Sequence, residues 1–431
     1  MKQRFEAKIH LLFQIPLRYN RLDIVHIAAG TVFGQRGENI KRVRNDFMNK
    51  RFTAVVLCCV LLAVTACGSK AKEDSKKEEK PAEAATTEVQ AVEKYKPAVH
   101  EEGKYYVGIV QQADHEALSL SSEGFRDRLN ELLGDEVEID YQISDGTKEK
   151  SDVIVDHFLQ DKDDLIMAAG TDALRCCVAA TTDVPIVGTA VTDFIIAGGV
   201  SSIGEPGGNV TGISDLPPMV TQRDLLVQLN SDGGQIGLLF CGEEANSQFQ
   251  CKLMEKYLDD GGHEWKEYAF SGSGDMEEVI KKACSESSVL YLPNDNTLAV
   301  NMETVNKHAL ESGTKVFTSD GSMCKKGGLV SYGVDYYELG VEAADMAYEV
   351  LVYGNMEYDE EEEEEYEDRG DIAKISVERV AETASAWYNP VVAEALGWTP
   401  TDTYSELDVE RPQDQEAEKP AEENGTTAEG N

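Results

Sequence analysis

The strongest constraint on the fold is a regular alternation of apolar strands and amphipathic helices between Tyr105 and about Trp398. The predicted strands of a first round are Tyr105–Val110, Val137–Tyr141, Leu165–Ala169, Pro185–Gly188 and Val210–Ile213. Those of a second round are Ile236–Cys241, Trp265–Phe270, Val289–Leu292, Lys315–Thr318 and Leu329–Tyr332. Such alternation implies parallel sheets with helices on both faces. We therefore expect an α/β protein with two Rossmann-like lobes, joined near Asp215–Thr221 and again beyond Ser319.

The net charge and the absence of catalytic motifs argue against two classes of function, nucleic-acid binding and enzymatic catalysis. The net charge is −40, from 40 basic and 80 acidic residues, which argues against nucleic-acid binding because that needs a basic patch. The chain contains no GxSxG elbow, HExxH, P-loop or dinucleotide fingerprint. His157 falls among apolar neighbours and suits a packed core, whereas His115 suits a position facing a cleft. We expect neither an enzyme nor a cofactor.

The cysteines give no metal signal. Six of the nine cysteines lie in the body of the chain: Cys176, Cys177, Cys241, Cys251, Cys284 and Cys324. They lack the CxxC spacing of a metal site, and we expect buried thiols. Exported proteins can oxidise, so one pair forming a disulfide is the alternative.

An export signal precedes the body. Lys50 and Arg51 are followed by an apolar run from Ala54 to Val64, which is too short to span a bilayer. Val64-Thr65-Ala66 followed by Cys67 resembles a bacterial lipobox. The resemblance implies that the Cys67 thiol carries a lipid and becomes the mature N-terminus, anchored at the outer face of the cytoplasmic membrane. An ordinary signal peptide with an incidental cysteine is the alternative.

Composition divides the rest of the chain. Residues 1–47 precede a natural start at Met48 and are expected to be a mis-annotated extension; a genuine cytoplasmic extension is the alternative. The signal peptide covers 48–66, and 67–102 lacks apolar periodicity, as expected of a disordered tether. Lobe 1 is predicted at 103–218 and 321–355, and lobe 2 at 219–320 and 356–398. Residues 399–431 are expected to be a disordered acidic tail.

Polar clusters follow nearly every predicted strand. Ligands of open α/β sheets bind beyond the carboxyl ends of the strands. Free backbone N–H groups at helix starts suit a carboxylate, and an aspartate such as Asp295 or Asp320 could take an ammonium. Asn, Ser, Thr and Asp are also ordinary helix caps and turn formers. Two such edges facing each other would form a cleft for a zwitterion.

Three segments resemble the substrate-binding lipoproteins of ABC importers, in the family that includes tryptophan- and tyrosine-binding members. They are 185–215, which contains Pro-Ile-Val-Gly-Thr-Ala-Val-Thr-Asp; 242–247, Gly-Glu-Glu-Ala-Asn-Ser; and 294–340, which contains Asn-Asp-Asn-Thr and Gly-Val-Asp-Tyr-Tyr-Glu-Leu-Gly. The resemblance implies a type I periplasmic-binding-protein fold with three crossovers and an interlobe cleft. By position it implies the ligand-facing residues Gln111, Thr171, Thr189, Asp193, Asn246, Ser247, Asp295, Asn296 and Asp320. We add His115, which suits a position facing the cleft, as a tenth candidate.

Two departures from that family affect the site. After the first strand the family usually has His-Pro-Ala-Leu-Asp, where this chain has His-Glu-Ala-Leu-Ser at 115–119. The difference leaves the selectivity for the ligand's side chain open. An acidic run at 359–365 replaces a short connection; it suits a solvated loop, with weak calcium binding as the alternative. Of Tyr336 and Tyr337, one could stack on an aromatic ligand, although core packing is the simpler interpretation.

These features together predict the solute-binding component of an ABC importer. It would capture a small molecule, an aromatic amino acid, and deliver it to permease subunits while anchored to the membrane as a monomer. Closure of the lobes around the ligand would be the form that the transporter recognises. A surface sensor that passes ligand occupancy to a receptor kinase is the alternative. A sugar-repressor-like regulator shares the fold but would need a basic DNA-binding domain.

Overall fold

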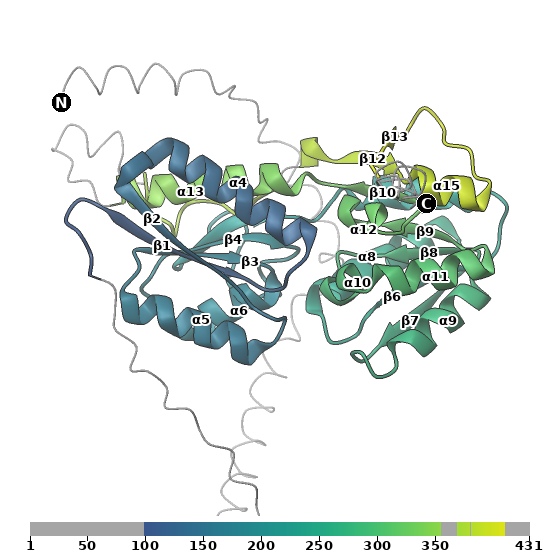
Figure 1. The fold of residues 1–431 in the computed structure, drawn as a ribbon, viewed down its shortest axis with the longest axis horizontal. Coiled ribbons are helices and arrows are strands. Elements are labelled where there is room, and N and C mark those ends of the chain that lie inside the picture. Colours follow the sequence, from purple (N-terminus) through teal and green to yellow (C-terminus); the bar gives the residue numbers. More distant parts are fainter. Residues whose placement is uncertain (1–98, 355–368, 380, 410–431) are drawn as a thin grey trace, which may run out of the picture. The chain divides into compact units, whose positions relative to one another are not determined.

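Two β-sheets with helices on both faces form the part of the chain that the structure describes (Figure 1). The computed structural model describes residues 99–354, 369–379 and 381–409, which all belong to one unit, Glu93–Asn431. The predicted extension, the signal peptide, Cys67 and the acidic run at 359–365 lie outside the described residues.

The first sheet is entirely parallel, with the order β11-β5-β4-β3-β1-β2. Its strands are β1 Tyr105–Gln111, β2 Val137–Ile143, β3 Leu165–Ala169, β4 Ile186–Val191, β5 Val210–Ser214 and β11 Glu378–Arg379. Helices α4 (Glu116–Leu133) and α13 (Tyr336–Tyr348) cover one face, and α5 (Lys148–Asp161) and α6 (Thr171–Ala180) cover the other (Figure 1).

The central strand β3 explains why both faces need helices. Leu165, Met167 and Ala169 pack in the cluster with α4 and α13, whereas Ile166 and Ala168 pack in the cluster with α5 and α6. All five are fully buried. Because successive side chains of a strand point to opposite faces, an uninterrupted apolar run fits only a strand covered on both sides.

The second sheet has the order β13-β12-β10-β9-β8-β6-β7 and is parallel except where β10 meets β12. Its strands are β6 Ile236–Cys241, β7 Trp265–Phe270, β8 Val289–Leu292, β9 Lys315–Thr318, β10 Val330–Gly333, β12 Ser385–Tyr388 and β13 Ser405–Glu406. Its helices are α7 Met219–Leu229, α8 Ala245–Gly261, α9 Met276–Glu286, α10 Asn296–Val300, α11 Met302–Ser312, α12 Gly321–Lys325 and α15 Pro390–Leu396. Short turns of helix lie at Gly134–Glu136, Glu349–Tyr353 and Ala381–Thr383.

The chain passes between the lobes three times: after β5, after β10 and after β11. This agrees with the type I periplasmic-binding-protein fold that the sequence indicates. All ten predicted strands are present, while β11, β12 and β13 were not predicted. These three are short and partly exposed, so they lack the apolar run that identifies a buried strand.

The lobe boundaries differ from the predicted ones in two places. Residues 321–333, assigned to lobe 1, belong to lobe 2, because Val330 and Ser331 of β10 pair in parallel with β9 before the chain crosses. Residues 378–379, assigned to lobe 2, pair with β5 and extend the sheet of lobe 1. Periodicity identifies a strand but does not say which sheet it joins.

The folded body also extends beyond both predicted ends. Ser405 and Glu406 pair with β12, and Tyr404, only 9% exposed, packs against Trp398. At the other end, His100 stacks on the ring of Tyr106, whose hydroxyl accepts a hydrogen bond from the Glu101 N–H. Residues 100–101 and 399–409 are therefore part of the body and not of the predicted tether or tail.

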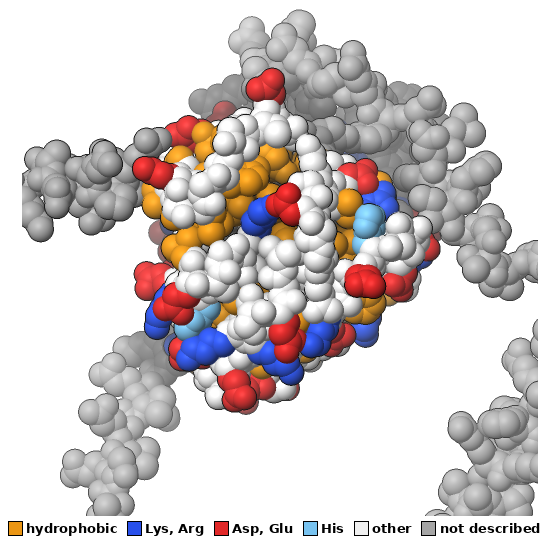
Figure 2. Space-filling model, turned by 90° about the vertical axis from the view of Figure 1, so that its right-hand side faces the viewer, with side chains coloured by type: hydrophobic (Ala, Val, Ile, Leu, Met, Phe, Trp, Pro, Cys, Tyr) orange, Lys and Arg blue, Asp and Glu red, His pale blue; other side chains and the backbone are white. Residues whose placement is uncertain are grey.

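The helices, the cysteines and the surface charges of the described residues have the properties expected of a globular α/β domain. None of the described helices combines the length and the hydropathy needed to cross a membrane. The six body cysteines are free and buried, and burial raises the thiol pKa of Cys176 and Cys324 to about 12. In Figure 2, which looks onto the second lobe, Lys and Arg alternate with Asp and Glu along the lower edge. This face therefore carries no continuous basic patch.

Candidate functional site

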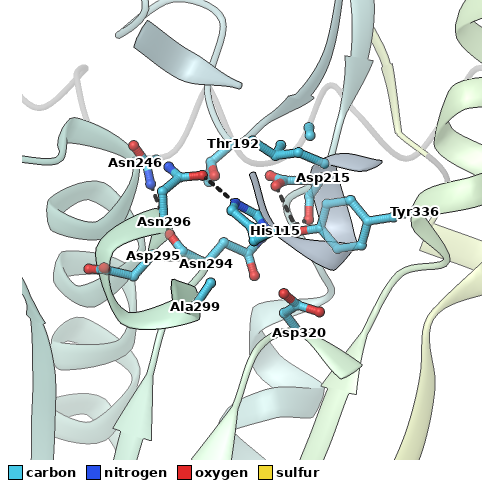
Figure 3. Close-up of a pocket in the computed structure, with 12 residues that line it drawn as sticks. His115, Thr192, Asp215, Asn246, Asn294, Asp295, Asn296, Ala299, Asp320 and Tyr336 are labelled. Atoms are coloured by element: carbon cyan, nitrogen blue, oxygen red, sulfur yellow. Dashed lines mark hydrogen bonds between the residues drawn. The ribbon is translucent and has the colours of Figure 1, made fainter. Parts of the chain in front are cut away.

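The ends of strands from both lobes meet the first turns of α4 and α13 around one polar cavity (Figure 3). It is lined by His115, Leu118, Ala190, Thr192, Asp215, Asn246, Asn294, Asp295, Asn296, Ala299, Asp320 and Tyr336. The volume open to the centres of water molecules is about 20 Å³. This is room for one or two water-sized groups, and not for a whole aromatic amino acid.

His115 connects the two lobes. It is the residue before α4 in lobe 1, is 7% exposed, and its Nε2 lies 2.9 Å from Asn296 Oδ1 in lobe 2 (Figure 3). The Asn296 amide nitrogen donates to Glu244 Oε2, so its oxygen is the atom that faces the imidazole. An oxygen that only accepts requires the proton on Nε2. Nδ1 has no hydrogen-bond partner among the described residues, and it is an acceptor whenever the ring is neutral.

Asp215 and Tyr336 form the second polar pair of the cavity. Asp215 follows β5 and is 2% exposed, and its Oδ2 accepts a hydrogen bond of 3.0 Å from the Tyr336 hydroxyl (Figure 3). Its Oδ1 has no hydrogen-bond partner. Burial raises the pKa of Asp215 to about 6, although hydrogen bonds to the carboxylate oppose the rise. At neutral pH, Asp215 is therefore a buried charge with a hydrogen bond from Tyr336 to one oxygen, and the side chains of Thr192 and Asn294 also favour its charged form.

The other two aspartates of the cavity serve as helix caps. Asp295 accepts hydrogen bonds from the N–H groups of Cys241 (2.7 Å) and Leu298 (2.8 Å). Asp320 accepts from the N–H (2.7 Å) and the hydroxyl (2.8 Å) of Ser322. Burial raises the pKa of both carboxyls. Because each of their oxygens already has a donor, Asp215 is the aspartate with an oxygen left for a ligand.

Glu244 fixes the lobe 2 side of the cavity and was not singled out from the sequence. It is 7% exposed and precedes α8. Its carboxylate accepts from the N–H groups of Asn296 (2.9 Å) and Thr297 (2.8 Å) and from both of their side chains. It also accepts from Asn246 Nδ2 at 3.2 Å. These bonds tie the loop after β6 to the loop after β8.

Asn294 contributes a third unpartnered acceptor. It is 8% exposed, its Nδ2 donates to the Asp215 carbonyl at 3.4 Å, and its Oδ1 has no partner. Its backbone N–H donates to Gln250 Oε1, whose side chain also bonds Tyr291 and Ser319 in the core of lobe 2. The residue that carries the acceptor is thus held by a buried network.

Backbone geometry shapes the wall formed by lobe 1. Ala190 has a φ of 54°, in the left-handed region that costs energy for a residue with a side chain, and it sits where β4 and β5 shift register. The neighbouring Gly212 has a φ of 150°, and a Cβ there would lie 2.0 Å from the Gly188 carbonyl oxygen. β-Bulges and strained residues of this kind change the direction in which neighbouring side chains point, and they are common beside functional sites.

A close helix contact places His115 and Tyr336 side by side. A Cβ added at Gly124 of α4 would lie 2.1 Å from the Tyr337 carbonyl oxygen, and one at Gly340 of α13 would lie 2.0 Å from that of Ser121. The two helices can approach this closely only because both positions are glycine. Their first turns, which carry His115 and Tyr336, therefore reach the same cavity.

The structure brings together five of the ten predicted ligand residues. His115, Asn246, Asp295, Asn296 and Asp320 line the cavity, and Gln111, Thr171, Thr189, Asp193 and Ser247 are not among its lining residues. Each of these five has another role in the structure. Gln111 accepts a hydrogen bond from the Tyr141 hydroxyl, and the Thr189 and Ser121 hydroxyls are hydrogen-bonded to each other. Ser247 donates to the Asn294 carbonyl, Asp193 accepts from the Ile196 N–H, and Thr171 is the first residue of α6. Whether any of them contacts a ligand stays a prediction.

Seven lining residues were not predicted. They are Leu118, Ala190, Thr192, Asp215, Asn294, Ala299 and Tyr336. Asp215 and Asn294 do follow predicted strands, the same signal that identified Asp295 and Asp320, so this rule could have found them. Tyr336 packs in the core of lobe 1, as the simpler interpretation of this tyrosine pair has it, and it also lines the cavity. Among the described residues, no three His, Cys, Asp or Glu side chains are grouped so that they could hold a metal ion.

Comparisons with known proteins agree on the family. The model of the ABC transporter substrate binding protein family matches residues 106–359. A tyrosine-binding protein of Clostridioides difficile (strain R20291) is 33% identical over 248 residues, which are 57% of this chain and 72% of the relative.

Solved structures point the same way. An ABC domain from Streptococcus pneumonia in complex with L-Trp is 27% identical, with a TM-score of 0.63 over 70% of this chain and 99% of that one. The ligand-free, open structure of a substrate binding protein with adhesive properties from Clostridium difficile is also 27% identical, with a TM-score of 0.55 over 71% and 100% of the two chains. The chain therefore belongs to the ABC transporter substrate-binding protein family.

Proposed function

We propose that the protein binds an amino acid with an aromatic side chain between its lobes and delivers it to an ABC permease. The observation that carries the proposal is a set of three polar atoms at the cavity that have no partner among the described residues: the acceptor oxygens Asp215 Oδ1 and Asn294 Oδ1, and His115 Nδ1, which is an acceptor in the neutral ring. Buried acceptors without donors are costly. A primary ammonium supplies three N–H donors and a positive charge, which is the complement that this set lacks.

The names of the relatives support the aromatic part of the proposal. One relative is named a tyrosine-binding protein, and a structural neighbour holds L-Trp. The cavity is too small for either amino acid, so binding requires the lobes to part and close again. The His115–Asn296 hydrogen bond is one contact that such a motion would break and remake.

Calorimetric titration of the soluble body with the twenty amino acids tests this proposal. We expect binding of L-tyrosine, L-phenylalanine or L-tryptophan, and loss of binding for the matched acid that lacks the ammonium, such as 3-(4-hydroxyphenyl)propionate for tyrosine. Asp215→Asn should weaken binding of the amino acid, and Asp156→Asn, at an exposed position on α5, is the control. Equal affinity for the amino acid and its deaminated analogue would contradict the proposal.

The proposal includes the cellular setting. The protein would act without catalysis, as a monomer on the outer face of the cytoplasmic membrane, held by a lipid on Cys67 after removal of residues 48–66. Cys67→Ser should move the protein from the membrane fraction to the medium and lower uptake of the labelled amino acid by intact cells. Retention of the variant in the membrane fraction would contradict the lipid anchor.

A further inference from the structure

A second and larger cavity adjoins the first. The two share the side chains of Asp320 and Tyr336 as lining residues. The volume open to the centres of water molecules is about 250 Å³, against about 20 Å³ in the first cavity. A ligand whose ammonium occupies the first cavity therefore has additional room next to it here.

The walls of the second cavity are largely apolar. Ala117 and Leu120 of α4 form one side, Val334 of the second crossover and Trp387 of β12 form another. The Trp387 ring lies over the start of α12, since a Cβ built on Gly321 would be 3.7 Å from its Cε3. Gly321 directly follows Asp320, so the indole lies beside one of the two residues that the cavities share.

Charges at this cavity disfavour an anionic ligand group. Among the described residues that line it, Lys325 is the only Lys or Arg. Its Nζ already pairs with Glu116 Oε1 at 3.0 Å and so joins α12 of lobe 2 to α4 of lobe 1. Asp335 and Asp408 add further negative charge. A neutral aromatic ring can pack against the apolar walls of this cavity without electrostatic repulsion. A ligand with a carboxylate side chain would be repelled by the acidic residues and would lose its hydration.

We propose that this second cavity is the subsite for the ligand's aromatic side chain, with Trp387 as the residue that sets the preference for a ring. The inference rests on the proposed function, because it takes the ammonium position at Asp215 as given. Aromatic rings gain from stacking or edge contacts with an indole in addition to the apolar area that they bury. Since α4 and Trp387 belong to different lobes, closure of the lobes would also tighten this subsite.

Titration calorimetry with L-tyrosine and L-alanine tests the subsite. We expect L-alanine to bind more weakly than L-tyrosine. Trp387→Ala should weaken L-tyrosine binding by about tenfold or more and leave the L-alanine affinity nearly unchanged. Leu120→Asp, at a half-buried position on the opposite wall, should have the same selective effect. Trp265→Ala, on the far edge strand β7, is the matched control and should not alter either affinity.

Fluorescence gives a second readout that does not depend on removing Trp387. The chain has three tryptophans, so Trp265→Phe combined with Trp398→Phe leaves Trp387 as the only indole. L-Tyrosine should then change the Trp387 emission saturably, with the midpoint found by calorimetry. L-Tyrosine binding that survives Trp387→Ala and Leu120→Asp unchanged would overturn the subsite and leave the proposed function intact. Failure of every amino acid to bind the unmodified protein would overturn both.

Discussion

His115 Nε2 and Asn296 Oδ1 lie 2.9 Å apart and join residues that are 181 positions apart in the chain. The first stands at the start of α4 in lobe 1, and the second begins α10 in lobe 2. Both line the polar cavity. The hydrogen bond therefore exists only while the lobes are close, and its loss reports their separation.

Removing this contact should weaken ligand binding by favouring the open state. For His115→Ala we expect a three- to tenfold rise in Kd, since a hydrogen bond contributes about 0.5–1.5 kcal/mol. The rise should come mainly from faster dissociation, measured by stopped-flow fluorescence. Lys148→Ala, which breaks an exposed ion pair within lobe 1, is the control. An unchanged dissociation rate in the His115 variant would argue against the contact's role in closure.

Asp215→Asn should separate binding from stability. The pKa of Asp215 is about 6 in the folded protein, against 3.8 for the unperturbed group. Between these values the folded state holds the proton more often, so the stability contributed by this group falls as the pH rises. Above pH 6, the buried charge of Asp215 lowers the free energy of unfolding by about 3 kcal/mol. The uncharged amide of the Asp215→Asn variant removes this loss.

The unfolding free energy in denaturant, measured from pH 3.5 to 7.5, checks this expectation. At pH 7.5 the Asp215→Asn variant should have a higher free energy of unfolding than the unmodified protein. This difference in unfolding free energy should shrink toward zero near pH 3.5. The amide can still accept the hydrogen bond from Tyr336, while amino-acid binding falls about tenfold to a hundredfold because a charged acceptor is lost. A variant that is less stable at every pH would show that the carboxylate is needed for the fold.

Asp163 should behave as a second, purely structural pH-sensitive group. It is 8% exposed, its Oδ2 has no hydrogen-bond partner, and it shares an acidic cavity with Glu138, Asp140 and Asp161. Burial, reinforced by the neighbouring carboxylates, raises its pKa to about 7. Stability therefore falls as the pH rises from about 4 to about 7, because over this range the folded protein keeps the proton that the unfolded chain has lost.

The matching variant is Asp163→Asn. Its melting temperature should exceed that of the unmodified protein at pH 7.5 and converge with it near pH 3.5, with a gain of up to about 4 kcal/mol at the higher pH. Asp156→Asn, at an exposed position on α5, is the control and should change little. Ligand affinity should be unaffected, because Asp163 lines neither of the two cavities in which we propose that the ligand binds.

Gly340→Ala should damage both stability and binding. The new Cβ would lie 2.0 Å from the Ser121 carbonyl oxygen and 2.7 Å from the Phe125 nitrogen, so α4 and α13 must move apart. We expect a loss of about 3 kcal/mol or more in unfolding free energy, at the upper end of overpacking costs. Gly204→Ala, where no atom lies within 4 Å of the added Cβ, is the control. An equally stable Gly340 variant would show that the helices can separate cheaply.

The sequence predicted the fold more completely than the site. Buried strands such as β3 and β6 are uninterrupted apolar runs, so their place in a parallel sheet follows from composition and spacing. β12 and β13 lack such runs, and their pairing depends on long-range contacts that no local pattern records. For the same reason, the sequence could not show that β10 joins lobe 2.

The site was only half predictable for a similar reason. Asp295 and Asp320 follow strands, as expected of ligand residues, yet the structure uses their oxygens to cap helices. Asp215 has the same local signal, and its unpartnered oxygen becomes apparent only from the packing of Tyr336 and Asn294 around it. Trp387 reaches the second cavity through the antiparallel pairing of β12 with β10, which the sequence did not reveal.

The three passages between the lobes also govern the order in which the protein can be completed. Lobe 1 needs α13, which follows five strands of lobe 2 in the chain. A nascent chain that has been synthesised only as far as Leu229 would carry α4 with the face that meets α13 uncovered. A single break in the chain therefore cannot separate one complete lobe from the other. During translation, lobe 1 can complete its fold only after α13 has been synthesised, when most of the chain is finished.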